Sequence, residues 1–209
     1  MRWYLVRHAQ TLWNGENRLQ GHADLELNAI GVEQAKRVGH FFASRRASGE
    51  ALTALYTSHL KRSAQTAHAI AEVTGLAPRR ETALAESHLG AWEGLTPDEI
   101  DAQFEGAYQR WYHRPSQVAI PGAEPLGAFT RRVRDAFDRI RAVENGREGS
   151  VVIVTHGGVI ASWLADWLKS DYDEILRRVV LSNAGISAVE YGHNLPSILW
   201  INSTRHLID

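Results

Sequence analysis

The sequence predicts an α/β protein, arranged as a three-layer α/β/α sandwich with a mostly parallel sheet and a helical insertion that covers the functional site. Two observations carry this prediction. Strand-like apolar runs alternate with helical patterns, and two of these runs, over 3–6 and 151–155, each continue directly into a histidine. Because open α/β sheets place their ligands at the carboxyl ends of the strands, we expect the site between these two strand ends.

The order of elements begins with the strand over 3–6 and a polar loop over 14–27. The side chain of Asn28 can accept hydrogen bonds from free backbone N–H groups, so we expect it to cap a helix that extends to about Arg46. The apolar run over 52–57 predicts the next strand.

The helix after this second strand is expected to start at Ser58, whose hydroxyl can cap it, and to stop at Gly75. A further helix start is marked at 96–99, where threonine and glutamate have capping-box spacing and proline occupies the first helical position. The surrounding segment, about 84–125, is rich in glycine, tryptophan, tyrosine and histidine and only weakly periodic. This composition, together with the weak periodicity, is expected of an insertion.

Apolar side chains spaced by three and four predict two later helices, over 126–140 and 160–168. The arginines of the first of these helices are expected to form a solvated face, interleaved with aspartates. Runs over 186–191 and 198–202 predict two late strands, paired antiparallel at the edge of the sheet. Since no repeat or low-complexity linker interrupts the chain, residues 1–209 are expected to form one domain.

The composition limits what the protein can be. It contains no cysteine, which excludes disulfides, thiolate zinc sites and a cysteine nucleophile. The formal net charge of −1 argues against a nucleic-acid partner. No apolar run approaches the ~20 residues of a membrane span, and the N-terminus lacks the pattern of a signal peptide, so a cytoplasmic location is expected. The oligomeric state stays open, with a homodimer as one option.

Both strand-to-histidine junctions carry residues suited to an anion. Arg7 offers a bidentate fork for a phosphate or carboxylate, and His8 can act as nucleophile or base. The alternative is a surface pair just past a strand. His156 precedes two glycines at the start of a helix, where free N–H groups favour an anion, although an ordinary tight turn would look the same.

Two further candidates lie outside these junctions. Arg62 could point toward an anion from the first turn of its helix, or it could be one of many solvent-exposed arginines. Glu86, a carboxylate among aromatic residues and glycines, is a candidate general acid, and its alternative is a surface loop residue. Each alternative is ordinary for a single residue, so it is the combination that favours an active site.

These candidates belong to a wider set of motifs that covers nearly the whole chain. The set comprises Leu5-Val6-Arg7-His8, Asn14, Gln20-Gly21, Ser58, Leu60, Arg62, Gln65-Thr66-Ala67, Glu86, Gly90, Trp92-Glu93-Gly94 and Thr155-His156-Gly157-Gly158. In this order the set resembles the histidine phosphatase superfamily and, more narrowly, the phosphatase subgroup of its phosphoglycerate-mutase-like branch.

The resemblance implies a role for each candidate. His8 would be the nucleophile that forms a phosphohistidine, and Arg7, Arg62 and His156 would bind the phosphate. Glu86 would be the proton donor. Further binding contacts are implied for Asn14, Gln20, Gly21 and Gly157, and neither a metal ion nor a cofactor is implied.

Physical chemistry is consistent with these roles. A phosphate monoester is anionic and repels nucleophiles, so two guanidinium groups and an imidazole donor would offset its charge. The same cations should keep His8 neutral, as a nucleophile must be. On residue type alone, Glu93, Asp24 or Glu124 could replace Glu86 as the acid.

Some positions depart from the pattern of the family. Ala9 stands in place of glycine, Gln10 in place of glutamate and His59 in place of aspartate. Pro125 ends a stretch that usually ends in serine. None of these departures removes a catalytic group, but they leave the pocket wall and the substrate open.

The sequence therefore predicts a metal-independent phosphomonoesterase that hydrolyses a small phosphorylated metabolite. A phosphoglycerate mutase is the first alternative, although mutases of this type resemble one another in paired arginines and a proline-rich loop where this chain has 109–115. A non-catalytic binder of phosphorylated ligands and a regulatory phosphatase acting on phosphoprotein are further alternatives. Phosphorylated sugars, phosphoglycerate derivatives, α-ribazole phosphate and phosphoserine all stay candidate substrates.

Overall fold

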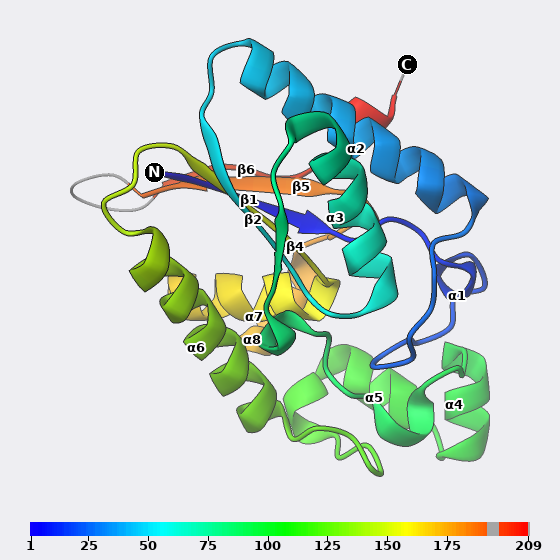
Figure 1. Cartoon of the computed structure of the whole chain (residues 1–209). Helices are drawn as coiled ribbons and strands as arrows, with labels where there is room; N and C mark the ends of the chain where they lie inside the picture. The colour runs from blue at the N-terminus through cyan, green and yellow to red at the C-terminus, as the bar shows by residue number, and fades with distance from the viewer. Residues whose placement is uncertain (192–196, 209) are drawn as a thin grey trace.

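The centre of the computed structural model, which describes residues 1–191 and 197–208, is a six-stranded sheet in the order β3-β2-β4-β1-β5-β6 (Figure 1). The strands are β1 (Arg2–Arg7), β2 (Leu52–Thr57), β3 (Pro78–Arg80), β4 (Ser150–Thr155), β5 (Ile186–Glu190) and β6 (Ser197–Ser203). From β3 to β1 all pairings are parallel, whereas β5 and β6 are added antiparallel. The mostly parallel sheet and the late antiparallel pair are both confirmed.

Strands β1 and β4 bring the two histidine junctions together. They are parallel neighbours with Arg7 opposite Thr155, so the next residues, His8 and His156, leave the sheet at the same edge. The backbone N–H of His8 donates to the carbonyl of Thr155 at 2.8 Å, which continues the pairing by one residue. The pattern of two strands that end in histidine thus marks a single place in the fold.

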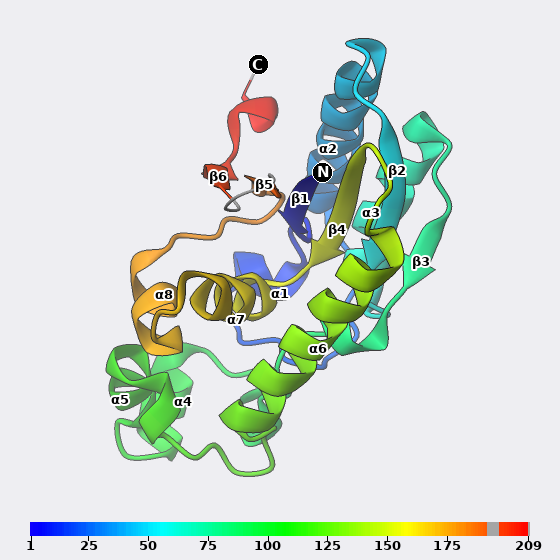
Figure 2. The same cartoon turned by 90° about the vertical axis from the view of Figure 1, so that its left-hand side faces the viewer.

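Helices cover both faces of the sheet (Figure 2). Helices α2 (Ala29–Ala47) and α3 (Lys61–Thr74) pack on one face, and α6 (Leu126–Glu144), α7 (Gly157–Leu168) and α8 (Tyr172–Arg178) lie on the other. Along β1, Trp3 and Leu5 belong to the core beneath α6 and α7, while Tyr4 and Val6 belong to the core beneath α2 and α3. This burial on both faces explains the continuous apolar run and confirms the three-layer sandwich.

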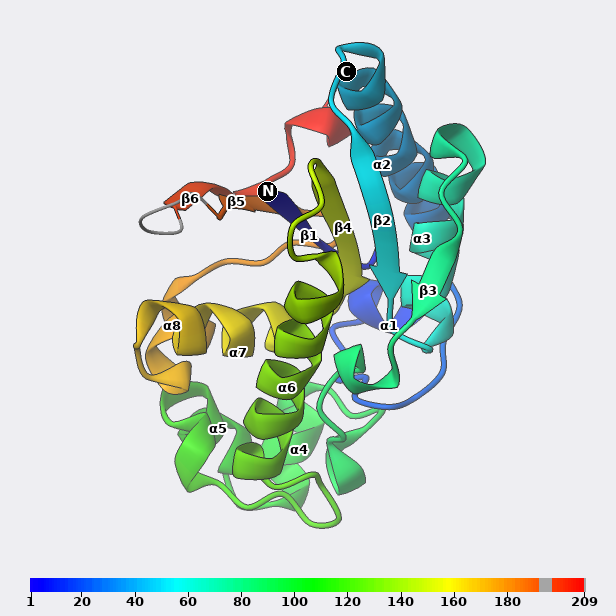
Figure 3. The ribbon, with the colours of Figure 1, turned by 60° about the vertical axis from the view of Figure 1, so that its left-hand side comes forward.

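The segment expected to be an insertion folds around short helices beside α8 (Figure 3). It contains α4 (Pro97–Gln103) and α5 (Ala107–His113), packed on a small core of Trp92, Ile100 and Ala107. The buried carboxylate of Asp173 in α8 accepts hydrogen bonds from the N–H of Ser116 at 2.9 Å and its hydroxyl at 2.6 Å. Single turns complete the chain: α1 (Leu12–Gly15), and 3₁₀ helices at Thr82–Leu84, Gly90–Trp92, Pro115–Gln117 and Arg205–Leu207.

Most of the predicted helix ends are confirmed. Asn28 accepts a hydrogen bond from the N–H of Gly31 at 2.8 Å, and Gly75 ends α3 with a φ of +71°. The capping box at 96–99 is complete. The predicted cap at Ser58 is wrong, because α3 starts three residues later and has no side-chain cap.

The prediction of a solvated arginine face on α6 is wrong for one residue, Arg132. Its guanidinium forms an ion pair with Glu124, with 2.7 Å between Nε and Oε1. It also donates to the carbonyl oxygens of Ala83, Ala85 and Glu86 at 2.7–2.9 Å. Helical periodicity shows which face a residue occupies, but not that a folded loop lies across from it.

Within the described ranges, no helix is both long and apolar enough to cross a membrane.

The closest approach of α2 and α3 gives a test of the packing. At Gly39 a Cβ would lie 2.6 Å from the backbone oxygen of Ala69. We expect Gly39→Ala to lower the free energy of unfolding by about 1–3 kcal/mol, since the two backbones must separate. Gly127→Ala is the matched control, because its Cβ meets nothing within 4 Å. Equal effects in a denaturant titration would contradict the close approach.

Candidate active site

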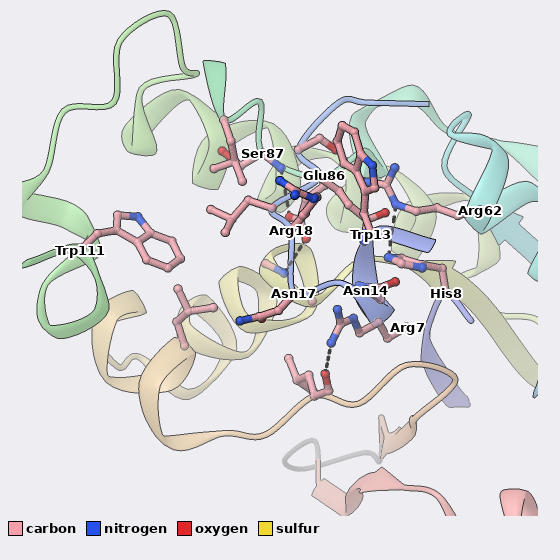
Figure 4. A pocket seen from close by; sticks show the side chains of 18 of the residues that line it. Arg7, His8, Trp13, Asn14, Asn17, Arg18, Arg62, Glu86, Ser87 and Trp111 are labelled. Carbon is pink, nitrogen blue, oxygen red and sulfur yellow. Dashed lines mark hydrogen bonds between the residues drawn. The ribbon is translucent and has the colours of Figure 1, made fainter. Parts of the chain in front are cut away.

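The predicted site residues meet at one cavity of about 350 Å³ at the carboxyl ends of β1 and β4 (Figure 4). Eight of them line it: Arg7, His8, Asn14, Gln20, Gly21, Arg62, Glu86 and Gly157. The ninth, His156, is fully buried behind the wall, with its ring centroid 5.2 Å from that of His8. The tertiary structure therefore gathers residues from six separate segments of the chain.

His8 has one ring nitrogen engaged and the other free to react. Its Nδ1 lies 2.8 Å from the carbonyl oxygen of Ala9, which can only accept, so Nδ1 carries the proton. Nε2 then keeps its lone pair and accepts a weak hydrogen bond from Nε of Arg62 at 3.3 Å. Burial, and next the charges of Arg62 and Arg7, hold the pKa of His8 well below its usual value. The imidazole is neutral, with Nε2 as the potential nucleophile.

Arg62 is a buried cation and not a solvent-exposed arginine, since only 1% of its surface is exposed. It donates to the carbonyl oxygens of Gly21 and Ala23, both at 2.7 Å. Burial lowers its pKa to about 10, so the guanidinium still carries its charge at neutral pH. Thr66, one turn further along α3, accepts from the N–H of Ala9 and donates to the carbonyl of Arg62. The helix is thereby tied to the end of β1.

Two buried donors at the cavity end have no acceptor among the residues that the structure describes. One is Nε of Arg7, whose NH1 donates to the carbonyl of Leu181. The other is Nδ1 of His156. Buried polar groups are normally hydrogen-bonded, so two unpaired donors in one place indicate an anionic ligand.

The tautomer of His156 follows from its other neighbour, Ser58. The hydroxyl oxygen of Ser58 accepts from the N–H of Leu60 and lies 2.8 Å from Nε2 of His156, and we assign the Ser58 hydroxyl as the donor in the second contact. Nδ1 then carries the ring proton. Burial, followed by the charge of Arg62, holds the pKa of His156 well below its usual value. The oxygen of Ser58 accepts from the N–H of Leu60, which precedes the first residue of α3, so it caps no N–H within that helix.

Asn14 presents its amide donors because its oxygen is occupied. Oδ1 accepts from the N–H and hydroxyl of Thr11 and from Nδ2 of Asn183, each at 3.1 Å. Asn183 also donates to the carbonyl of His8 at 3.1 Å. The sequence analysis missed Asn183, and nothing in the local pattern around it signals this role.

Glu86 lies at the amino terminus of α7. One carboxylate oxygen accepts from the N–H of Gly158 at 3.0 Å and the other from the N–H of Ser87 at 3.0 Å. A Cβ at Gly158 would lie 2.4 Å from the carboxylate, so a larger residue here would displace the Glu86 side chain. The motif contains both glycines, but the resemblance implies a binding contact only for Gly157, and the contact of Gly158 with Glu86 was not predicted. The backbone carbonyl of Glu86 is held by Arg132 at 2.8 Å and by His22 at 2.7 Å.

The other carboxylates considered as the acid have structural partners instead. Glu124 is paired with Arg132, and Glu93 accepts from the N–H groups of His22 and Leu89. Asp24 accepts from the N–H of Lys61 at 2.7 Å. Glu86 is the one carboxylate among the residues that line the cavity, and no cluster of three metal-ligating side chains occurs in the described part of the chain.

The departures from the family pattern lie outside the cavity wall. Ala9 is fully buried under the site, and Gln10 accepts a hydrogen bond from the side chain of Asn28 at 2.9 Å. His59 is exposed, and Pro125 precedes α6.

Comparison with known proteins gives consistent matches. A model of the histidine phosphatase superfamily (branch 1) matches residues 3–204. The chain is 39% identical over 160 residues to phosphoglycerate mutase-like protein 4 of Arabidopsis thaliana, covering 76% of this chain and 67% of that protein. It is 30% identical over 203 residues to phosphoserine phosphatase 1 of Hydrogenobacter thermophilus, covering 97% and 92%. A solved structure of mycobacterial glucosyl-3-phosphoglycerate phosphatase with VO3 is similar, with a TM-score of 0.84, 30% identity, and coverage of 97% and 99%.

The two buried histidines predict how stability depends on pH. Their pKa values in the folded protein are lowered, so below about pH 6.5 the unfolded chain binds protons that the folded protein does not. The free energy of unfolding should therefore fall as the pH drops, by up to about 1.4 kcal/mol per pH unit for each histidine.

Denaturant titrations between about pH 8 and pH 5 measure this slope. His156→Gln should make it shallower, whereas His68→Gln, which removes an exposed imidazole, should not change it. A slope that is the same in all three proteins would contradict the neutral, buried state of His156.

Proposed function

The chain belongs to the histidine phosphatase superfamily (branch 1) and is a phosphatase of that type; from this premise we propose that it hydrolyses small phosphomonoesters through a phosphohistidine at His8, without a metal ion. The observation that carries the proposal is the neutral His8, whose unprotonated Nε2 lies beside the buried Arg62, with the unpaired donors of Arg7 and His156 at the same end of the cavity. This arrangement provides a nucleophile and an anion site in the same place.

In the first step, Nε2 of His8 attacks phosphorus, and the bond between phosphorus and the ester oxygen breaks. The alcohol leaves with a proton from Glu86, so the products are a phosphohistidine and a neutral alcohol. In the second step, Glu86 takes a proton from water as the water oxygen attacks phosphorus. His8 and inorganic phosphate are released, and Glu86 is again protonated.

The phosphoryl oxygens would be held by the groups that the protein leaves unpaired. Arg7 offers Nε, His156 offers Nδ1–H, and Asn14 offers Nδ2. Arg62 adds a second positive charge next to Nε2 of His8. Gln20, Gly21 and Gly157 line the same end of the cavity and complete the proposed cradle.

The positive charge that phosphoryl transfer requires comes from protein groups in this proposal. Arg7 and Arg62 together can match the two negative charges of a phosphate dianion, which is the task of metal ions in many other phosphatases. This supports hydrolysis without a metal ion.

The mutase alternative is weaker for this chain. A mutase would need the same phosphohistidine and, in addition, cations that hold the carboxylate of phosphoglycerate. The arginines of the 109–115 segment do not supply them: Arg110 donates to the carbonyl of Glu105 at 2.7 Å, and neither Arg110 nor Arg114 lines the cavity. A purely binding role is disfavoured because both His8 and Glu86 are present at the cavity. The homodimer and the cytoplasmic location stay predictions from the sequence.

The nucleophile is tested by substitution. We expect His8→Ala to reduce phosphomonoesterase activity by at least about 10³-fold, because the covalent step is lost. Brief exposure of the unmodified enzyme to labelled substrate should yield a protein-bound phosphate that is labile to acid and stable to base. His68→Ala, which alters an exposed histidine, should keep full activity. Activity that disappears with a chelator and returns with added metal would contradict the mechanism.

The acid is tested through the leaving group. A poor alkoxide needs a proton as it leaves, whereas an activated aryl oxide does not. Glu86→Gln should therefore slow an alkyl phosphate by about 10²–10⁴-fold and an aryl phosphate far less. Asp24→Asn is the control, since that carboxylate lies outside the cavity. Small, equal losses for both substrates in Glu86→Gln would assign the proton transfer to another group.

A further inference from the structure

The cavity has two ends with different chemistry, as Figure 4 shows. His8, Arg7 and Arg62 form the end where the phosphate is proposed to bind. Trp111 lies across the cavity from His8 and Arg62 (Figure 4). We call the rest of the cavity the outer end; its apolar lining consists of Leu19, Leu89, Trp111, Leu176 and Val179, whereas Trp13 lies beside Arg62 (Figure 4).

The outer end contains one further cation, Arg18, and this cation is already paired. Its NH1 lies 2.7 Å from the carboxylate of Glu99, and its Nε lies 3.2 Å from that of Glu16. NH1 also donates to the carbonyl of Gly94 at 2.7 Å. One guanidinium with two carboxylates has a net charge of −1, so this cluster does not attract a second anion.

At the end of the cavity where the phosphate is proposed to bind, the phosphate itself balances the positive charges. A phosphate dianion matches the two positive charges of Arg7 and Arg62; among the other ionisable wall groups, Glu86 is acidic, and burial raises the pKa of the Tyr172 phenol, which therefore stays uncharged. A carboxylate on the alcohol part of a substrate would lose its water against tryptophan and leucine side chains without gaining a cation. Burial of an unpaired charge is strongly unfavourable.

Resting on the proposed function, we propose that the preferred substrates are phosphomonoesters of uncharged alcohols with an apolar face, such as an aromatic or alkyl group. Carboxylate-bearing esters of the phosphoserine and phosphoglycerate kind are poor substrates. Apolar contact with Trp111 and Leu176 stabilises the bound alcohol part. The neutral polar groups of Asn17 and Ser87 in the same wall accommodate hydroxyl or amide substituents.

Three matched esters test the proposal with the unmodified enzyme: benzyl phosphate, 4-carbamoylbenzyl phosphate and 4-carboxybenzyl phosphate. The alcohols are similar leaving groups, and the amide has nearly the size of the carboxylate without its charge. We expect kcat/KM to be similar for benzyl and carbamoylbenzyl phosphate and lower by about tenfold or more for the carboxylate. Equal values for all three esters, or a preference for the carboxylate, would overturn the proposal.

A charge placed in the outer wall should reverse the discrimination. Leu176→Arg puts an unpaired cation into the cavity and is expected to raise kcat/KM for the carboxylate relative to the amide by about tenfold. Val180→Arg is the matched control, because Val180 is 73% exposed and does not line the cavity. If Leu176→Arg and Val180→Arg both keep the original ratio of kcat/KM between the carboxylate and the amide while still hydrolysing benzyl phosphate, the alcohol part does not contact this wall. The proposal then fails.

The outcomes for selectivity and for the proposed function are separable. If hydrolysis persists in His8→Ala, the phosphohistidine mechanism itself fails; if none of the three esters is hydrolysed while phosphoserine is, the substrate class is wrong. If all three are hydrolysed at equal rates and His8→Ala is inactive, the mechanism stands and only the substrate class is wrong.

Discussion

Burial of cations around a neutral imidazole is the constraint on which the rest of the site depends. Arg62 has lost nearly all of its water, and a buried ion is tolerated only when polar groups replace that water. The carbonyl oxygens of Gly21 and Ala23 do so, which fixes the loop after α1 against the start of α3. The same burial and charge keep His8 neutral. One arrangement therefore creates the proposed anion site and keeps the proposed nucleophile uncharged.

The loop that solvates Arg62 also connects the cations to the acid. At Gly21, with a φ of +50°, a Cβ would lie 2.1 Å from the carboxylate of Glu93, so the two segments pack without a side chain between them. Glu93 accepts from the N–H of His22, and the ring of His22 bonds to the carbonyl of Glu86. Arg132 holds the same carbonyl from the other side. The position of Glu86, the proposed acid, thus depends on the loop that surrounds Arg62.

The two ends of the cavity come from different parts of the fold. The phosphate end is built at the edge of the sheet by β1, the start of α3 and the junction of β4 with α7, where parallel strands must end together. The outer end is built largely by α5 and α8. Asp173 joins α8 to the insertion, so the outer wall is held as one unit. The sheet edge supports the chemistry, and the added helices define the space for the alcohol.

The local features of this protein were determined by the sequence alone. Three local features depend on residues close in the chain: the apolar runs, the helix cap at Asn28 and the capping box at 96–99. The α/β class and most of the element boundaries could therefore be predicted. The site residues could be predicted from their sequence motifs. Contacts between distant segments could not. Ser58 caps no helix because α3 starts only at Lys61, and its hydroxyl contacts His156, which follows a distant strand. Arg132 leaves the solvent because the loop around Glu86 folds across α6, and Asn183 reaches His8 only when the sheet has formed. Hydrogen-bond partners and burial are properties of the tertiary structure, because a side chain's neighbours are set by packing between segments that sequence spacing does not relate.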